Sequence, residues 1–441
     1  ATRCPVCQAR GKGQRREIIT LLRGGSATSV SIITEGLFPT LSKDEKRVLI
    51  FADSRQDTAH QAGYSRDRHQ TFTQRQIVYR ALQDHEEREG LPITLDQLYL
   101  EVYTYCRREW QSEADALNLL ALREPEPGDP IGLYNPDENI PAQEVSHAKK
   151  RLEWDLYVEF TDRANTRNSL EREGLVTANY ALLEETIRAN ISQFYDVGFT
   201  EQDSGFVINL VRAMMDQMRR KKAVVYDPFR DFLSAGSDYR QRKIARPTRF
   251  NRAPNGFSQE GKTIKGAYNV FSWESSRSAI YNLVSRTLEG WDSKRIASFI
   301  DKVFKLLVLK GYVRKVKIGQ LTGGRANLTW EAYQLVPKFI ELTTSGKPYQ
   351  CKSCGYVRGY QLEKWGQPGQ TICPTWRCPG RTGSYKPRSD NFYVQSYRDR
   401  APERMYVVEH SGQLGEQERE EIERYFKDGR INVLVLSLIH I

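Results

Sequence analysis

The chain lacks a start methionine, a secretory leader and any apolar run long enough to cross a lipid bilayer. A leader would place a basic stretch before a short apolar segment, and its absence predicts a cytoplasmic protein. With 441 residues, the chain is long enough for about two to four domains. Ala1 in place of a start methionine suggests that the sequence begins inside a longer protein.

One segment matches the sequence pattern of a phosphate-binding loop, but the residues around it do not fit a working loop. Residues 256–263 read Gly-Phe-Ser-Gln-Glu-Gly-Lys-Thr and match the pattern letter for letter. A functional loop follows a buried strand and opens a helix whose N-terminus faces the phosphates. Residues 246–254 contain two prolines and three arginines and cannot form such a strand, and Gly266 weakens any helix that follows. We therefore expect no ATP-hydrolysing motif in this chain, and a true loop would require Lys262 for ATP affinity.

Basic residues outnumber acidic ones, with 66 Lys and Arg against 55 Asp and Glu and a net charge of +11. This surplus favours an anionic partner, of which nucleic acid is the commonest. The alternative is a solvated basic surface. Residues 236–265 combine many Arg and Lys residues with Pro, Gly and little periodicity. This composition predicts a linker or an arm that contacts phosphates.

Six of the seven cysteines lie in pairs, which predicts metal ligands in a reducing compartment rather than disulfides. Four of them have two, eighteen and four residues between successive thiols, as in a zinc ribbon: Cys351, Cys354, Cys373 and Cys378. Four thiolates close the coordination of Zn²⁺ and predict a structural ion. Cys4 and Cys7 are half of a second site or two unliganded thiols. Cys106 shares helical spacing with apolar neighbours and is expected in the core.

Aromatic residues near this cysteine group allow two interpretations. They could stack on bases of a nucleic acid. Packing of a small metal domain is the preferred interpretation for all four: Tyr356, Tyr360, Trp365 and Trp376.

Two segments at opposite ends of the chain have the pattern of parallel β–α units. Residues 48–52 form a continuous apolar run, which is typical of a parallel strand covered on both faces. A helical pattern follows to about residue 82. Near the other end, a strand, a crossover helix and a second strand are predicted at residues 405–408, 416–427 and 431–435.

The region between these segments is predicted to be helical at first and then to change. Helical periodicity dominates residues 83–235, and it includes core positions at Leu182, Leu183, Ile187, Ile191 and Phe194 and at Val207, Leu210, Val211, Met214 and Met218. Two helices at 278–288 and 293–309 precede a predicted hairpin at 310–316 and 328–335. This order resembles a winged helix, a family that commonly binds duplex nucleic acid, although a domain used only for packing would have the same pattern.

Several segments resemble motifs of superfamily-2 DEAD/DEAH-type helicases that carry zinc-binding cysteines and large insertions. Residues 47–59, Arg-Val-Leu-Ile-Phe-Ala-Asp-Ser-Arg-Gln-Asp-Thr-Ala, resemble motif IV. Residues 410–414, His-Ser-Gly-Gln-Leu, with residues 426–435, resemble the approach to motif V. Residues 169–176 resemble part of the insertion. The matches cover a minor part of the chain, in the expected order.

The resemblance implies an α/β plus α fold with an incomplete RecA-like parallel sheet that is split by a mostly helical insertion. The winged-helix-like segment and the zinc ribbon lie within the chain between its two parts. The implied divisions are a partial zinc knuckle and connector (1–25), the first part of the second RecA-like domain (26–82), a helical insertion and basic linker (83–265), the winged-helix-like domain (266–345), the zinc ribbon (346–390) and the truncated second part of the RecA-like domain (391–441).

In such motors, ATP and Mg²⁺ bind between two RecA-like domains, and the first of these is not visible in this sequence. The resemblance therefore implies an internal fragment of an ATP-dependent nucleic-acid helicase or translocase. Its expected partners are DNA and the first RecA-like domain, and the fragment alone is expected to be inactive. Five residues are implied to contact backbone phosphates: Ser54, Arg55, Gln56, His410 and Gln413. Arg55 could instead pair with Asp53 or Asp57.

The main alternative is a non-catalytic DNA-binding protein built from a winged helix and a zinc ribbon, and a subunit that binds acidic proteins is a third. The arrangement of the strands distinguishes them. Parallel pairing of residues 47–52, 405–409 and 431–435 would favour the motor, and separate placement would favour the alternatives. Residues 436–441, Leu-Ser-Leu-Ile-His-Ile, resemble translated sequencing adapter, so we expect the natural continuation to differ.

Overall fold

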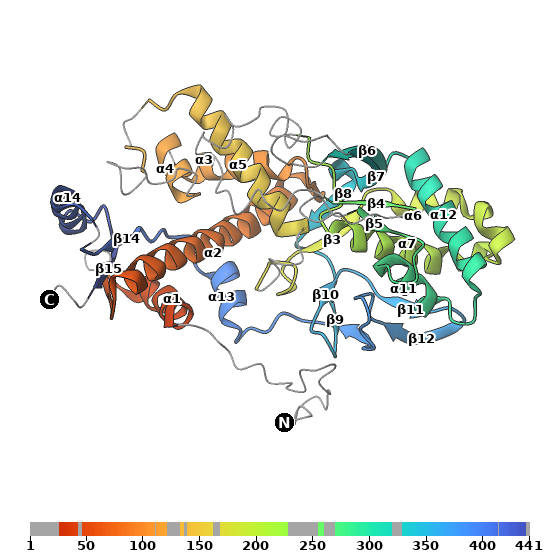
Figure 1. Cartoon of the computed structure of the whole chain (residues 1–441). Helices are drawn as coiled ribbons and strands as arrows, with labels where there is room; N and C mark the ends of the chain where they lie inside the picture. Colours follow the sequence, from red (N-terminus) through yellow and green to blue (C-terminus); the bar gives the residue numbers. More distant parts are fainter. Residues whose placement is uncertain are drawn as a thin grey trace, which may run out of the picture. The chain divides into compact units, whose positions relative to one another are not determined.

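The computed structural model describes residues 26–42, 46–110, 112–120, 133–135, 139–161, 168–227, 255–259, 270–319, 329–412 and 414–437. The chain forms two compact units: unit 1 comprises 1–78, 103–148 and 396–441, and unit 2 comprises 79–102 and 149–395. The boundaries fall within four helices: α2 (Arg55–Glu89), α3 (Leu98–Glu109), α5 (Ala142–Thr161) and α13 (Phe392–Asp399) (Figure 1).

Unit 1 contains a three-stranded parallel sheet built from both ends of the chain. Its strands are β1 (Val48–Ala52), β14 (Val407–His410) and β15 (Val433–Ser437), in the order β1-β15-β14. Val433 lies opposite Val48 on one side and Val407 on the other. Figure 1 shows the red β1 beside the dark blue β15. The predicted strands therefore lie side by side and parallel.

Helices cover the two faces of this sheet. On one face, α1 (Ser26–Leu37), the 3₁₀ helix η1 (Phe38–Thr40) and α2 contribute to a core with alternate strand residues: Phe38, Ile50, Ala62, Met405, Val407, Val433 and Val435. On the other face, α14 (Glu416–Lys427) packs Ile422 against Val408 and Leu434. Helix α14 has the predicted bounds. The short helix α4 (Glu113–Leu119) also belongs to unit 1, and Ser112 caps it.

The prediction that residues 48–52 are covered on both faces is wrong. Leu49 and Phe51 are 48% and 51% exposed. Both side chains lie on the face of the sheet that carries α14, but α14 packs only against β14 and β15. Strand β1 is at the edge of the described sheet, where α14 does not reach, so only Ile50 on the opposite face is buried.

In unit 2, the predicted helical segment consists of α6 (Leu183–Ala189), the 3₁₀ helices η4 (Ile191–Val197) and η5 (Glu201–Asp203), and α7 (Ser204–Arg219). The five predicted core positions of α7 are all buried, so Met214 and Met218 are packing residues. Leu182 differs from the prediction because its left-handed backbone (φ 54°) precedes α6 and leaves the side chain 67% exposed. Cys106 of α3 is buried, as predicted.

Short strands missed by the helical prediction form a second sheet in unit 2. Strand β8 (Ile340–Thr343) lies between β2 (Ile93–Thr94) and β3 (Thr177–Tyr180), and both pairings are antiparallel. Two-residue and four-residue strands give little periodicity, because their pairing is decided by a distant partner. The 3₁₀ helix η6 (Pro337–Phe339) leads into β8.

The predicted helix–helix–hairpin segment is present in unit 2. Its helices are α11 (Ala279–Thr287) and α12 (Ser293–Leu309), and the side chains of Ser278 and Asp292 cap them. Strands β6 (Val313–Gly319) and β7 (Thr329–Leu335) pair antiparallel. The sheet also includes β4 (Gly256–Ser258) and β5 (Val270–Ser272), in the order β5-β4-β7-β6.

The segment that resembles a phosphate-binding loop begins with β4. Phe257 is buried and pairs with Phe271 and Tyr333 of the neighbouring strands. Its first residues are therefore a sheet strand rather than a loop, which agrees with the interpretation of the match as accidental. Lys262 lies outside the described residues. Among the helices that the structure describes, none combines the length and the apolar character that a membrane crossing requires.

Candidate metal centre and sheet-edge site

The four predicted cysteine ligands come from two turns of unit 2. Cys351 ends β9 (Tyr349–Cys351), which pairs with β10 (Val357–Arg358) and β13 (Thr382–Ser384). Cys373 follows β12 (Gln367–Ile372), the partner of β11 (Leu362–Lys364). We call residues 351–355 the first knuckle and residues 373–380 the second knuckle. Gly355 permits the first turn through its positive φ of 67°.

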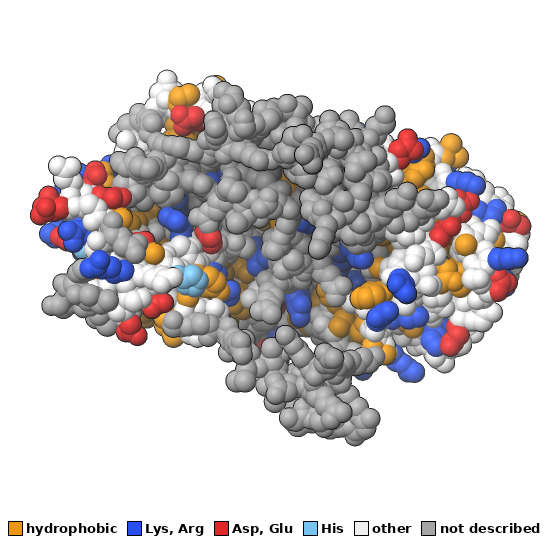
Figure 2. Space-filling view, in the orientation of Figure 1, with side chains coloured by type: hydrophobic (Ala, Val, Ile, Leu, Met, Phe, Trp, Pro, Cys, Tyr) orange, Lys and Arg blue, Asp and Glu red, His pale blue; other side chains and the backbone are white. Residues whose placement is uncertain are grey.

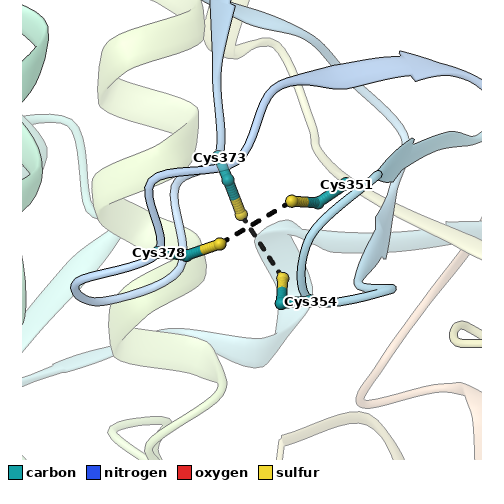
Figure 3. A group of neighbouring side chains, drawn as sticks. All are labelled: Cys351, Cys354, Cys373 and Cys378. Atoms are coloured by element: carbon teal, nitrogen blue, oxygen red, sulfur yellow. Dashed lines mark hydrogen bonds between the residues drawn. The ribbon is translucent and has the colours of Figure 1, made fainter. Parts of the chain in front are cut away.

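The four thiols converge on one point. Their Sγ atoms all lie within 4.8 Å of one another, and Figure 3 shows each side chain directed toward a common centre. Cys351 Sγ is 3.7 Å from Cys378 Sγ, and Cys354 Sγ is 3.6 Å from Cys373 Sγ. Cys354 is half-buried and the other three are buried. This group could hold a metal ion, with each cysteine as one ligand.

Backbone N–H groups donate hydrogen bonds to two of the sulfurs. The N–H groups of Ser353 and Thr375 donate to the sulfurs of Cys351 and Cys373, each at 3.4 Å. Such bonds stabilise thiolates, which are the form that binds metal. Burial raises the pKa of the Cys378 thiol to about 11, and a bound cation would oppose that effect.

Gly380 allows the two knuckles to approach each other. A Cβ atom at this position would lie 2.5 Å from Cys351 Sγ and 2.6 Å from Ser353 Oγ. The Gly380 carbonyl also accepts a hydrogen bond of 2.9 Å from the Cys373 N–H. Only glycine therefore fits without movement of a metal ligand.

Arg286 of α11 is not a candidate ligand but binds the backbone of the second knuckle. Its guanidinium donates to the carbonyls of Cys378 and Cys373, at 2.6 and 2.5 Å. Burial lowers the pKa of Arg286 from its usual value, and negative charge on the cysteines acts in the opposite direction. Gln217 of α7 donates to the Pro374 carbonyl at 2.7 Å. Two helices from earlier in the sequence thus fix the turn that carries Cys373 and Cys378.

A buried charge cluster joins the metal ribbon to α7. Asp216 accepts hydrogen bonds of 3.0 Å from the hydroxyls of Tyr180 and Tyr360, and it pairs with Arg219 at 3.0 Å. Arg358 lies 3.7 Å from the same carboxylate. Burial would raise the pKa of Asp216, but Arg219, Arg220 and Arg358 lower it to about 2. The pairing of opposite charges makes this buried arrangement tolerable.

The second acidic member of the cluster is Glu171. It lies in the segment that resembles part of the helicase insertion and pairs with Arg219 and Arg220, at 2.7 and 2.8 Å. Residues 168–176 form turns, with positive φ at Asn168 and Gly174, and lead into β3. This turn therefore has a packing role, because it delivers one carboxylate to α7.

The aromatic residues near the metal centre do not behave alike. Tyr356 and Tyr360 are buried, and the Trp365 ring packs 4.8 Å from that of Phe199. These three agree with the preferred packing interpretation. Trp376 differs, because it lies in the second knuckle and is 40% exposed.

At the sheet of unit 1, the predicted phosphate-contacting residues gather at one edge. Parallel pairing brings the carboxyl ends of β1, β14 and β15 together. Ser54 precedes α2 and binds Asp57 through its hydroxyl, at 2.7 Å. Arg55 and Gln56 are exposed in the first turn of α2, and Arg55 has no ion pair with any described residue. His410 ends β14 and lies 3.0 Å from Glu423 of α14.

Other predicted positions lie outside the described residues: Gln413, Cys4, Cys7, most of the basic segment 236–265 and the last four residues. Figure 2 shows Lys and Arg side chains among Asp and Glu side chains on the described parts of its face, rather than one continuous basic area. The net positive charge therefore does not by itself locate a nucleic-acid site.

The sequence did not reveal Arg286, Gln217 or Asp216 as supports of the metal ribbon. Each reaches a partner far away in the chain, and no spacing signals that contact. Comparison with known proteins adds no assignment: no protein family, no curated protein and no solved structure matches this chain.

Proposed function

We propose that unit 1 contains part of the second motor domain of an ATP-dependent nucleic-acid helicase or translocase, and that DNA is its substrate. The observation that carries this proposal is the parallel pairing of β1 with β15 and of β14 with β15. Segments from opposite ends of the chain meet in one sheet, as a split motor domain requires. A winged helix joined to a zinc ribbon would have no need of this sheet.

The connections of the sheet also support the proposal. Helix α2 follows β1 and packs on one face, whereas α14 joins β14 to β15 and packs on the other. Helices on both faces of a parallel sheet are the doubly wound arrangement, in which ligands bind at the carboxyl ends of the strands. Ser54, Arg55 and His410 lie at that edge.

Contact with phosphates is the role that this edge fits best. Arg55 is exposed at the start of a long helix, where backbone N–H groups and the helix dipole favour anions. Of the two carboxylates that were its possible partners, Asp57 is bound by Ser54, and Asp53 has no ion pair with any described residue. Backbone contacts of this type position a strand without reading its sequence.

We further propose that the cysteine centre holds a structural Zn²⁺. Zinc–sulfur bonds of about 2.3 Å in a tetrahedron place sulfurs about 3.8 Å apart. The Cys351–Cys378 and Cys354–Cys373 sulfur pairs are 3.7 and 3.6 Å apart, and all four sulfurs lie within 4.8 Å of one another. Four thiolates leave no ligand position for water, so the ion would hold the fold rather than activate a substrate. Metal analysis of the purified protein tests the assignment, and absence of zinc with four reactive thiols would refute it.

Binding of a fluorescein-labelled oligothymidylate, followed by fluorescence anisotropy, tests whether the sheet edge binds nucleic acid. Affinity should fall steeply between about 50 and 200 mM salt, because Lys and Arg side chains that bind phosphates displace counterions from the nucleic acid, and added salt opposes this release. Arg55→Gln should weaken binding and reduce the salt slope by about 1. Arg88→Gln is the matched control, since Arg88 lies at the other end of α2 and is paired with Asp84. Salt-independent binding, or equal effects of the two variants, would contradict the proposal.

A further inference from the structure

The second knuckle presents an aromatic surface that packing does not use. Trp376 is 40% exposed, although nearby Tyr356 and Tyr360 are buried. The guanidinium carbon of Arg377 lies 4.4 Å from the centre of a Trp376 ring. An exposed indole beside an arginine has the composition of sites that stack on nucleic-acid bases.

This surface is held in place before any ligand arrives. Arg377 has a left-handed backbone with φ of 55°, and its N–H donates to Asn282 Oδ1 of α11 at 3.2 Å. On either side of this tip, Arg286 binds the carbonyls of Cys373 and Cys378. A fixed turn loses little conformational entropy on binding, and this favours affinity.

Three basic side chains of the metal ribbon lack an acidic partner among the described residues. Lys352, Arg377 and Arg381 are exposed and have no ion pair with any described residue. Lys352 and Arg381 lie next to each other, since the Lys352 N–H donates to the Arg381 carbonyl at 3.1 Å.

The helix–hairpin segment differs, although it was the expected duplex-binding part. Three of its basic side chains are paired, Lys302 with Asp196, Arg314 with Asp227 and Lys315 with Glu331, whereas Lys294 and Lys310 are exposed and have no ion pair with any described residue. What distinguishes the second knuckle from this segment is therefore the exposed indole of Trp376 beside the unpaired Arg377, rather than unpaired charge alone.

We propose that Trp376 stacks on an unpaired base of single-stranded nucleic acid, while Arg377, Lys352 and Arg381 contact the adjoining phosphates. The inference deepens the proposed function and rests on it. A duplex hides the faces of its bases, whereas a single strand offers them to an aromatic side chain. Sugar and sequence are not read by stacking, so DNA and RNA probes should both respond.

The experiment compares Trp376→Ala with Trp376→Phe in the full chain with zinc bound. Fluorescence anisotropy is measured with labelled oligothymidylate, oligouridylate, a duplex and an abasic deoxyribose-phosphate strand. Loss of one stacked base should weaken binding of both single strands by about 5- to 150-fold. Trp376→Phe should retain most of the affinity, and neither variant should alter duplex or abasic binding by as much.

Tyr195→Ala is the control, because Tyr195 is also exposed, at 44%, and its hydroxyl is bound to Glu201 rather than placed among cations. Zinc content is measured for each variant to show that the knuckle remains folded. Salt-sensitive binding that is unchanged by Trp376→Ala would overturn the stacking surface and leave the proposed function standing. Such a result would favour a protein partner for the exposed indole. Failure of the wild-type chain to bind any strand would overturn both.

Discussion

Replacement of Arg286 by methionine tests how the fold supports the metal centre. Methionine keeps much of the apolar stem and removes two hydrogen bonds, of 2.6 and 2.5 Å, to the carbonyls of Cys378 and Cys373. Hydrogen bonds with a charged partner contribute about 1.5–3 kcal/mol each. Because Arg286 is only partly buried, a total loss of roughly 2–4 kcal/mol in the free energy of unfolding is expected.

The metal should be affected beyond this loss of stability. Four thiolates around a divalent cation leave a net negative charge, which the guanidinium partly offsets. Groups that orient metal ligands typically contribute 10- to 100-fold in metal affinity, so release of zinc should accelerate by about that factor. Arg286→Lys keeps the charge but cannot reach both carbonyls in the same way, and an intermediate rate is expected.

Release is measured by transfer of zinc to a coloured chelator, and stability by urea denaturation of the same samples. Arg295→Met is the matched control, since Arg295 also donates to a carbonyl, that of Val197 at 2.7 Å, and stacks on Trp291. Both variants should lose stability, whereas only Arg286→Met should release metal faster. Equal release rates from the two variants would refute the argument that Arg286 positions the second knuckle.

Three further predictions concern unit 2. Asp216→Asn should cost about 3–5 kcal/mol in urea denaturation, because it leaves buried arginines without their counter-charge, and a loss below about 1 kcal/mol would contradict this. Because the arginines lower the pKa of Asp216 to about 2, its stabilising contribution is complete above its unfolded-state pKa and is lost as acid approaches the folded-state value. Thermal unfolding should therefore show a steeper fall in stability between about pH 4 and pH 2 for the wild-type chain than for Asp216→Asn. Gly380→Ala should reduce zinc affinity in chelator competition, since the new methyl would meet Cys351 Sγ at 2.5 Å, whereas Gly383→Ala, whose methyl would meet only Lys352 Cε at 3.8 Å, should not.

The features that the sequence predicted well depend on neighbours in the chain. Helix α12 has the predicted bounds, Ser293–Leu309, because its cap at Asp292 and its apolar spacing are both local. The metal ligands could be found for the same reason, since each knuckle is a tight turn whose cysteine spacing is visible in the sequence. Parallel pairing of β1, β14 and β15 followed from their apolar runs and the resemblance together.

The features that it missed depend on contacts between distant residues. The apolar run at 48–52 gives no sign that β1 is at the edge of the described sheet, so the exposure of Leu49 and Phe51 could not be foreseen. An arginine in the last turn of a helix, such as Arg286, ordinarily suggests an interaction with the helix dipole. Its contacts with two cysteine carbonyls become visible only in the folded structure.

The split sheet of unit 1 has a consequence for how the protein is made. Strand β1 is synthesised long before its neighbour β15, so the pair cannot form until residues 53–432 have been made and β15 has left the ribosome. Closing so long a loop is slow if the intervening chain is flexible. Unit 2 lies within that loop and has its own core. Folding of unit 2 during synthesis would replace a long flexible connection with a compact one, and would shorten the time during which β1 is exposed to other nascent chains.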